Sequence, residues 1–188
     1  DILEMDLANL MDVQITSAGR KSQVLSDVPA AVYVINREKI FESGATTIAE
    51  ALRLVPGLQV ARINANRWAI SSRGFNGTFS NKLLVQIDGR SVYTPSYSGV
   101  YWDLQHVLIE DVDRIEVIRG PGATLWGANA VNGIINVITL PASDTQGGLV
   151  SLGTGTHAKL MAGARVGAKL KTDTYARVYA MGNDRESC

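Results

Sequence analysis

Hydrophobic residues in the first 140 positions fall into short runs separated by polar or glycine-rich stretches. Short runs of β-branched and aliphatic residues bounded by turn residues are typical of strands. They predict strands over residues 32–35, 58–63, 67–72, 83–87, 115–118 and 134–138. A different spacing, with Ile48, Ala51, Leu52 and Val55 on one face, predicts a helix in the middle of this region.

The predicted helix has recognisable start and stop signals. Thr46 or Thr47 can cap it, and Glu50 follows Thr47 at the spacing of a capping box. Pro56 and Gly57 then end it. Later, Asp88 and Gly89 separate an apolar run from polar residues and predict a hairpin turn. Short strands mixed with short helices predict an α+β fold around a small mixed sheet.

The N-terminal stretch has its own pattern. Leucines at helical spacing predict a short amphipathic helix over residues 1–12, and residues 13–16 are typical of extended chain. An extended segment of this kind can donate a strand to the sheet edge of a partner, or it can be a plain linker. The pattern alone leaves both interpretations open.

The hydrophobic pattern changes after a loop-rich stretch at residues 141–148. From Ala158 to Leu170 every even position is apolar, whereas the odd positions include Lys159, Arg165 and Lys169. The alternation resumes at residues 174–180, so residues 171–173 form the turn. Its length matches the 9–11 residues of a strand that crosses a membrane in a barrel, with the apolar face toward lipid. An ordinary antiparallel hairpin packed on a soluble core would give the same pattern.

Composition narrows the function classes. Hydrophobic residues make up 46% of the 188 positions, and the formal net charge is zero, so the basic excess of a nucleic-acid-binding protein is missing. The one cysteine, Cys188, cannot pair within the chain, and His106 and His157 lie far apart without other ligands at metal-binding spacing. We therefore expect no metal, no cofactor, no nucleic acid and no enzymatic activity.

A glycine-rich segment at residues 118–125 has the sequence IRGPGATL and superficially matches a dinucleotide-binding loop. However, Leu125 occupies the position of the third glycine, and Pro121 removes a backbone donor that would face a phosphate. The segment is better explained as a tight turn. Arg73 and Arg119, which both follow strands, are either partners for carboxylates or solvated residues at strand ends.

Several blocks of sequence together resemble a known family. The order and content of these blocks are similar to the plug domains of TonB-dependent outer-membrane receptors. The blocks are IAEALRLVPGL at residues 48–58, RGF at 73–75, LVQIDGR at 84–90, and IEVIRGP through WGANA and GIINVIT at 115–139. They cover most of residues 28–140, and the alternating strands follow where the family places its barrel.

The resemblance implies a transporter in the outer membrane of Gram-negative bacteria. Its plug faces the periplasm, closes a 22-stranded barrel and contributes to binding a scarce nutrient such as a ferric siderophore or cobalamin. Energy comes through TonB, which pairs with an N-terminal TonB box. The implied domains are an N-terminal segment (1–27), the plug (28–140), a linker (141–148) and the first barrel strands (149–188). The alternative is a free-standing periplasmic interaction module with a plug-like fold.

The resemblance also implies roles for particular residues. The TonB box matches Asp12, Val13, Gln14, Ile15 and Thr16. Outward-facing substrate loops match positions that include Asn64, Asn66, Arg67, Phe75, Asn76, Phe79, Tyr93, Tyr97, Tyr101 and Trp102. Arg73 and Arg119 match plug arginines that pair with carboxylates of the barrel wall. Because so few strands cannot close a barrel, we expect either disordered strands or self-association of the chain through an open edge.

Overall fold

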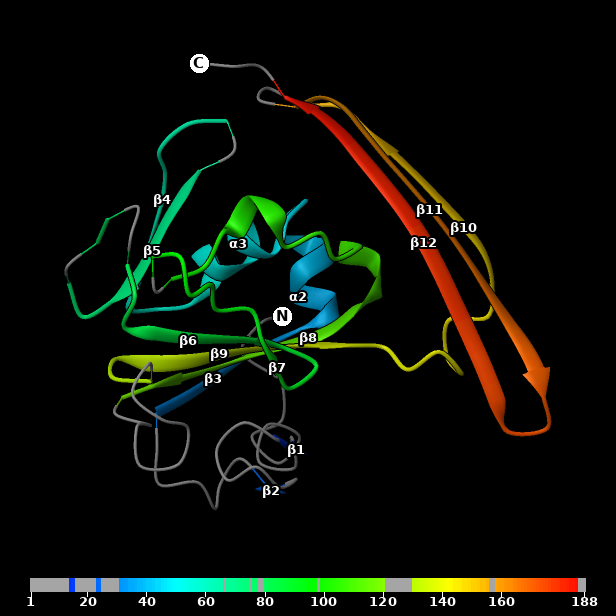
Figure 1. The fold of residues 1–188 in the computed structure, drawn as a ribbon, viewed down its shortest axis with the longest axis horizontal. Coiled ribbons are helices and arrows are strands. Elements are labelled where there is room, and N and C mark those ends of the chain that lie inside the picture. The colour runs from blue at the N-terminus through cyan, green and yellow to red at the C-terminus, as the bar shows by residue number, and fades with distance from the viewer. Residues whose placement is uncertain are drawn as a thin grey trace.

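The computed structural model describes residues 14–15, 23–24, 31–65, 67–74, 76–77, 80–97, 99–120, 130–155 and 158–185. The chain has two parts (Figure 1). Residues between 31 and 140 form a globular part with a mixed sheet and short helices. Residues from 147 onward form a long antiparallel sheet beside it, called the outer sheet below. The predicted α+β fold followed by antiparallel strands is confirmed.

The centre of the globular part is a five-stranded sheet. Its strand order is β3-β8-β9-β6-β7, and only the β6–β9 pair is parallel. The strands are β3 (Ala31–Asn36), β6 (Leu83–Ile87), β7 (Arg90–Ser91), β8 (Val112–Arg119) and β9 (Gly133–Thr139). Asp88 and Gly89, at φ 50° and 76°, connect β6 to β7 as the predicted two-residue hairpin turn.

Short helices cover one face of this sheet (Figure 1). They are α2 (Arg37–Glu42), α3 (Ile48–Ala51) and the 3-10 turn η2 (Leu52–Leu54). Ile40, Ala51 and Leu52 pack there against Ile35, Ile115 and Ile135 in the main core. The predicted cap is present, since the Thr47 hydroxyl accepts from the Glu50 amide at 3.2 Å. The Glu50 carboxylate bonds Thr46 instead of Thr47, so the capping box closes one residue earlier than predicted.

A separate hairpin joins the helices to β6. Its strands are β4 (Leu58–Arg62) and β5 (Trp68–Ser72), paired antiparallel from Leu58 opposite Ser72 to Arg62 opposite Trp68. Two further 3-10 turns, η3 (Trp102–Leu104) and η4 (Ile109–Asp111), lead into β8. At the start of the chain, β1 (Gln14–Ile15) pairs antiparallel with β2 (Gln23–Val24).

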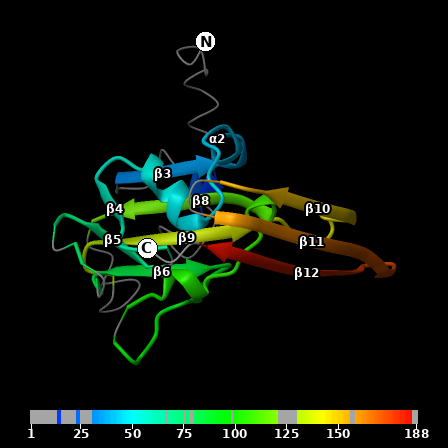
Figure 2. The same cartoon turned by 90° about the horizontal axis from the view of Figure 1, so that it is seen from above.

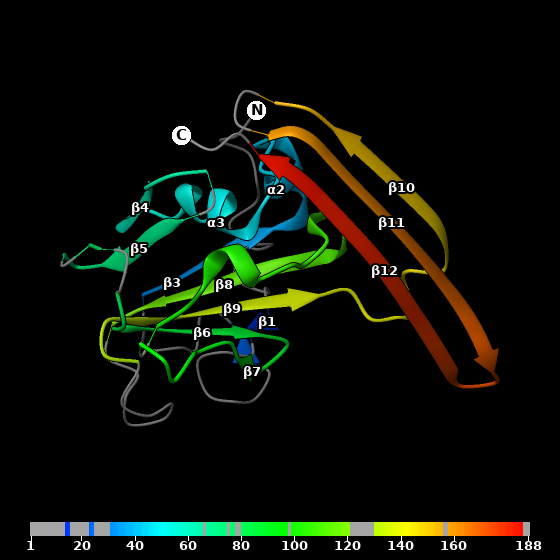
Figure 3. The same ribbon diagram turned by 45° about the horizontal axis from the view of Figure 1, so that its top comes forward.

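The outer sheet consists of β10 (Gly147–Gly153), β11 (Ala158–Lys171) and β12 (Thr174–Arg185), in that order. Figure 2 shows the three strands side by side and extending past the globular part. In the view of Figure 3, β12 is drawn on the side of the outer sheet toward the globular part. β10 begins inside the predicted 141–148 linker, so the domain limits remain a prediction. None of the helices in the described ranges has the length and apolar character needed to cross a membrane.

Candidate functional site: the junction between the globular part and the outer sheet

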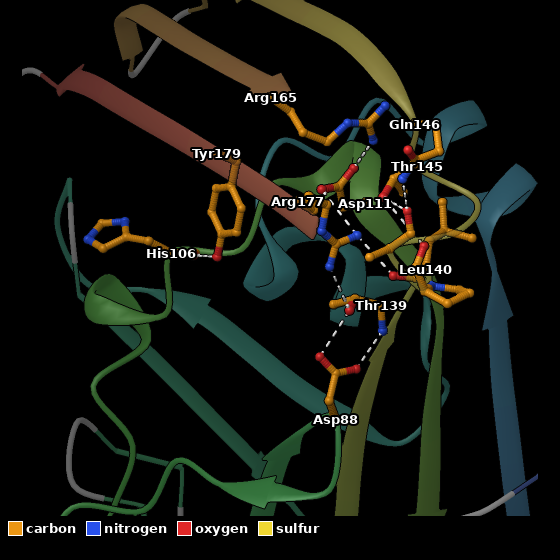
Figure 4. Close-up of polar contacts among 12 residues, drawn as sticks. Asp88, His106, Asp111, Thr139, Leu140, Thr145, Gln146, Arg165, Arg177 and Tyr179 are labelled. Atoms are coloured by element: carbon orange, nitrogen blue, oxygen red, sulfur yellow. Dashed lines mark hydrogen bonds and ion pairs between the residues drawn. The ribbon is translucent and has the colours of Figure 1, made fainter. Parts of the chain in front are cut away.

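The two parts of the chain meet around one buried carboxylate. Asp111 ends η4 immediately before β8, and only 2% of it is exposed. Arg165 of β11 forms a hydrogen bond and ion pair with Asp111 Oδ1, and Nη1 of Arg177 on β12 lies 3.4 Å from Oδ2. Figure 4 shows both guanidinium groups pointing at this carboxylate from neighbouring strands. One carboxylate of the globular part therefore pairs with two arginines of the outer sheet.

A chain of polar contacts extends this pairing into the central sheet. Arg177 also donates to the Leu140 carbonyl at 2.9 Å and to Thr139 Oγ1 at 3.3 Å. The Asp88 carboxylate accepts from the Thr139 amide at 2.8 Å and from its hydroxyl at 2.9 Å (Figure 4). Asp88, Asp111, Thr139, Arg165 and Arg177 are called the junction below. It ties the β6–β7 turn and the end of β9 to both β11 and β12.

Backbone contacts and close packing support the junction on either side. The Tyr179 hydroxyl donates to the His106 carbonyl at 3.1 Å, and Arg185 donates to the Ala65 carbonyl at 3.3 Å. Gly167 leaves no room for a larger residue, because a Cβ there would lie 2.0 Å from the Thr145 carbonyl oxygen. The inward face of the outer sheet therefore fits closely against the rest of the chain.

The other face of the outer sheet is exposed and apolar. Its large residues have high exposed fractions: 75% for Val150, 76% for Leu152, 65% for Val166 and 73% for Val178. Val166 and Val178 lie opposite each other across the β11–β12 pair. The period-2 alternation read from the sequence thus separates an apolar outward face from an inward face that carries Arg165 and Arg177.

The predicted TonB box is only partly described. Gln14 and Ile15 form β1, which agrees with the extended chain predicted for residues 13–16. Their partners are Val24 and Gln23, in that order. Asp12, Val13 and Thr16 lie outside the described residues.

The first predicted substrate loop is a tight turn between β4 and β5. The Asn64 side chain accepts from the Arg67 amide at 2.8 Å, and the Arg67 carbonyl accepts from the Ile63 amide at 2.9 Å. The Arg67 side chain is exposed. Asn66, in this first loop, lies outside the described residues. In the next loop Asn76 is exposed, while Phe75 and Phe79 lie outside the described residues.

The aromatic residues of the third loop divide into two groups. Tyr97 and Tyr101 contact each other edge to face, with ring centroids 4.7 Å apart. Burial, with contributions from Tyr101 and Asp103, raises the pKa of Tyr97 to about 12, so its phenol stays protonated at neutral pH. Trp102 instead packs against the main core, and Tyr93 is half-buried. Of these aromatic side chains, Tyr101 is the exposed one, at 41%.

Arg73 and Arg119 lie at the ends of β5 and β8, as predicted. Arg119 Nη1 donates to the Pro56 carbonyl at 2.9 Å, within the globular part. Arg73 has a left-handed backbone at φ 62°, and its Nη2 lies near Gly120, the residue after Arg119. The two arginines thus occupy one neighbourhood, while their role in contacting barrel-wall carboxylates remains a prediction.

The sequence reasoning missed the junction. Asp111 and Arg165 are 54 positions apart, and no local pattern links them. A signal was nevertheless present, because Arg165 and Arg177 are charged positions on the inward face of strands rich in glycine and alanine. Such residues need a buried counter-charge once that face is covered.

Comparisons with known proteins agree with this architecture. The model of the TonB-dependent Receptor Plug Domain family matches residues 24–134. The vitamin B12 transporter BtuB of Vibrio vulnificus (strain CMCP6) is 35% identical over 150 residues, which cover 79% of this chain and 24% of that protein. The chain therefore spans about a quarter of the length of this relative.

Solved structures show the same fold. The ferric-catecholate import receptor Fiu from E. coli K12, in its open form, superposes with a TM-score of 0.68 at 26% identity, over 94% of this chain and 24% of that one. The ferripyoverdine receptor of the outer membrane of Pseudomonas aeruginosa, bound to ferripyoverdine, superposes with a TM-score of 0.69 at 23% identity. The match covers 92% of this chain and 22% of that one. With its globular part matched by the family model, this chain belongs to the TonB-dependent receptor plug domain family.

Proposed function

We propose that this chain is the plug and the first wall strands of an outer-membrane transporter in a Gram-negative bacterium. In this role the globular part, which is the plug, closes the barrel, and the outer sheet begins the barrel wall. The transported molecule is a small scarce nutrient, of the class of ferric siderophores or cobalamin. The names of the similar proteins support this class, since they include a vitamin B12 transporter and a ferripyoverdine receptor.

The observation that carries the proposal is the opposite character of the two faces of the outer sheet. One face bonds to the globular part through Arg165 and Arg177, and the other exposes Val150, Leu152, Val166 and Val178. Barrel strands of the outer membrane place apolar residues toward lipid and polar residues toward the lumen. A free-standing water-soluble module would instead leave a broad apolar surface in water, which is unfavourable.

Energy coupling is proposed to run through the segment Asp12, Val13, Gln14, Ile15 and Thr16. Added strands bind a partner through backbone hydrogen bonds, so the segment must be able to adopt extended chain. The extended backbone of Gln14 and Ile15 in β1 supports this requirement. Because β1 pairs with β2, binding of TonB on that same edge would have to displace Gln23 and Val24.

A capture experiment tests the coupling. The full chain in detergent is incubated with a purified TonB C-terminal domain, and the captured amount is compared with that of Ile15→Pro and Ile15→Val. Proline removes the backbone donor that strand pairing uses, whereas valine keeps a strand-forming residue. We expect capture by the wild type and the valine variant and loss in the proline variant. Equal capture by all three proteins would contradict the assignment of this segment as the TonB box.

A further inference from the structure

A second feature of the chain, apart from the junction, is a cleft rich in arginine. Its globular side is formed by residues at the start of α3, in η2 and at the end of β4, including Glu50, Arg53 and Arg62. Its other side is formed by the ends of β10, β11 and β12, including Thr154 and Arg185. Figure 3 shows the end of β12 close to α2 and α3. This arginine cleft therefore opens between the plug and the wall.

The charge of the arginine cleft is unbalanced. Among the described residues, its lining contains three arginines, Arg53, Arg62 and Arg185, and one carboxylate, Glu50, which gives these side chains a net charge of +2. The whole chain is formally neutral. An excess of guanidinium groups in a cleft attracts anions and concentrates them there.

One of these arginines is fixed in place. Arg62 Nη2 lies 2.5 Å from Glu50 Oε1, and its guanidinium stacks 4.6 Å from the centre of the Trp68 ring. Arg53 stacks on the same ring at 5.2 Å. Trp68 is buried and thus gives both arginines a rigid platform.

Donors remain available after these contacts. Arg62 Nε is buried and has no acceptor among the described residues. Arg53 is exposed, and its stacking on Trp68 uses none of its five N–H donors. Arg185 uses one nitrogen on the Ala65 carbonyl, at 3.3 Å. Guanidinium forks match the two oxygens of a carboxylate or phosphate.

The counter-charge of Glu50 is already committed. Burial alone would raise the pKa of the Glu50 carboxyl, but hydrogen bonds from the Thr46 hydroxyl and amide and the charges of Arg62 and Arg185 outweigh it. This pKa is therefore held below its ordinary value, and Glu50 is ionised at neutral pH. Its single charge offsets only one of the three arginines.

We propose that the arginine cleft binds an anionic oxygen group, a carboxylate or a phosphate, of the molecule that the transporter takes up. Arg53 and Arg185 bind the anion directly, and Arg62 is the positioning residue held by Glu50 and Trp68. This inference rests on the proposed transport function, because it takes the ligand to reach the cleft between plug and wall. It specifies, within that function, a negatively charged oxygen group on the transported molecule.

Binding of simple anions tests the proposal. The full chain in detergent is titrated separately with citrate and with inorganic phosphate, by calorimetry and by tryptophan fluorescence, to which Trp68 contributes. We expect saturable binding that Arg53→Gln and Arg185→Gln each weaken about tenfold, the cost of one charged hydrogen-bonding group. The matched control Arg90→Gln, in the exposed β7 outside the cleft, should bind as the wild type does.

A variant that gains affinity for the anion distinguishes the proposal from a loss of binding caused by misfolding. Glu50→Gln keeps an oxygen for the Thr46 hydrogen bonds but removes the cleft's negative charge and its ion pair with Arg62, which Trp68 still holds, so it should bind the anion several-fold more tightly. Absence of saturable binding, or equal weakening by Arg90→Gln, would overturn the arginine cleft as a site. Because TonB capture does not depend on these anions, a chain that captures TonB but binds neither anion refutes this inference and leaves the proposed function standing.

Discussion

The central sheet and the outer sheet use the same backbone geometry in opposite surroundings. In β8, residues on both faces are buried, so Val117 and Glu116 are both fully covered. In β11, Arg165 is 9% exposed, whereas the neighbouring Val166 is 65% exposed. A strand that is buried on both faces need not alternate apolar and polar residues, whereas a strand whose two faces meet different environments must do so. The globular part thus carries its own core, and the outer sheet depends on what lies on each side of it.

The two sheets also differ in how they are joined to the rest of the molecule. The central sheet is held by the apolar core around Ile115 and Ile135. The outer sheet is joined to the globular part by polar contacts at Asp111, and it packs closely at Gly167 against Thr145 of the connecting segment. Loss of one charge should therefore matter more at the junction than elsewhere on the globular surface.

Removal of the shared carboxylate should have the largest effect. Asp111→Ala leaves Arg165 and Arg177 covered without a counter-charge, which typically costs about 3–5 kcal/mol. We expect this loss in the free energy of unfolding, measured by urea titration in detergent micelles. Asp113→Ala is the matched control, because Asp113 is 37% exposed and Arg114 keeps its bond to Glu116. That control should cost less than about 1 kcal/mol, and equal losses would contradict the special role of Asp111.

A charge on the outward face should have the next largest effect. If this face meets lipid, Val178→Lys costs about 2–4 kcal/mol near the middle of the bilayer. The measurement is the free energy of unfolding of the chain refolded into phospholipid vesicles. Thr174→Lys, at the turn that begins β12, should cost about 0–1 kcal/mol. A chain that tolerates lysine equally at both positions would indicate that water, and not lipid, covers this face.

A smaller loss is expected where the outer sheet approaches the connecting segment. Gly167→Ala places a methyl group against the Thr145 carbonyl and should cost about 1–3 kcal/mol, because the strand must shift. Gly182→Ala in β12 is the control, since nothing lies within 4 Å of its added Cβ. Thermal unfolding of both variants gives the comparison. An unchanged midpoint for Gly167→Ala would mean that the sheet is not packed closely there.

The smallest effect should come from acid. The pKa of Glu50 is lowered in the folded chain, so the stability it contributes is fully present above its ordinary value of 4.5 and is lost as the pH falls through the folded value. Between pH 7 and pH 3 the wild type should lose more thermal stability than Glu50→Gln, which has no such titration. A parallel decline of the two proteins would show that this carboxyl does not contribute.

Local signals in the sequence were enough to predict much of the fold. The short apolar runs, the Thr47 cap and the Asp88–Gly89 turn all depend on neighbouring residues, and the structure contains each of them. The β11–β12 alternation was readable because each face meets one kind of environment. The start of β8 at Val112 was missed, since the polar Asp113 and Arg114 interrupt its apolar run.

Long-range features could not be read in the same way. The parallel pairing of β6 with β9 and the ion pairs at Asp111 join residues distant in the chain. The charges of Arg165 and Arg177 signalled that a partner is needed, but one sequence does not identify which residue it is. The family resemblance assigns roles to particular loops and arginines. Its assignment of Arg73 and Arg119 to barrel-wall carboxylates stays a prediction, whereas the ion pairs at Asp111, which join the globular part to Arg165 and Arg177, were not part of it.

The central claim is that Asp111 and Arg165 join the plug to the wall directly. A double-mutant cycle with Asp111→Asn, Arg165→Gln and the combined variant, followed by urea unfolding in detergent, measures their coupling. The claim predicts that the double variant is more stable than the sum of the single losses implies, by at least about 1 kcal/mol. Additive losses, within about 0.5 kcal/mol, would contradict it.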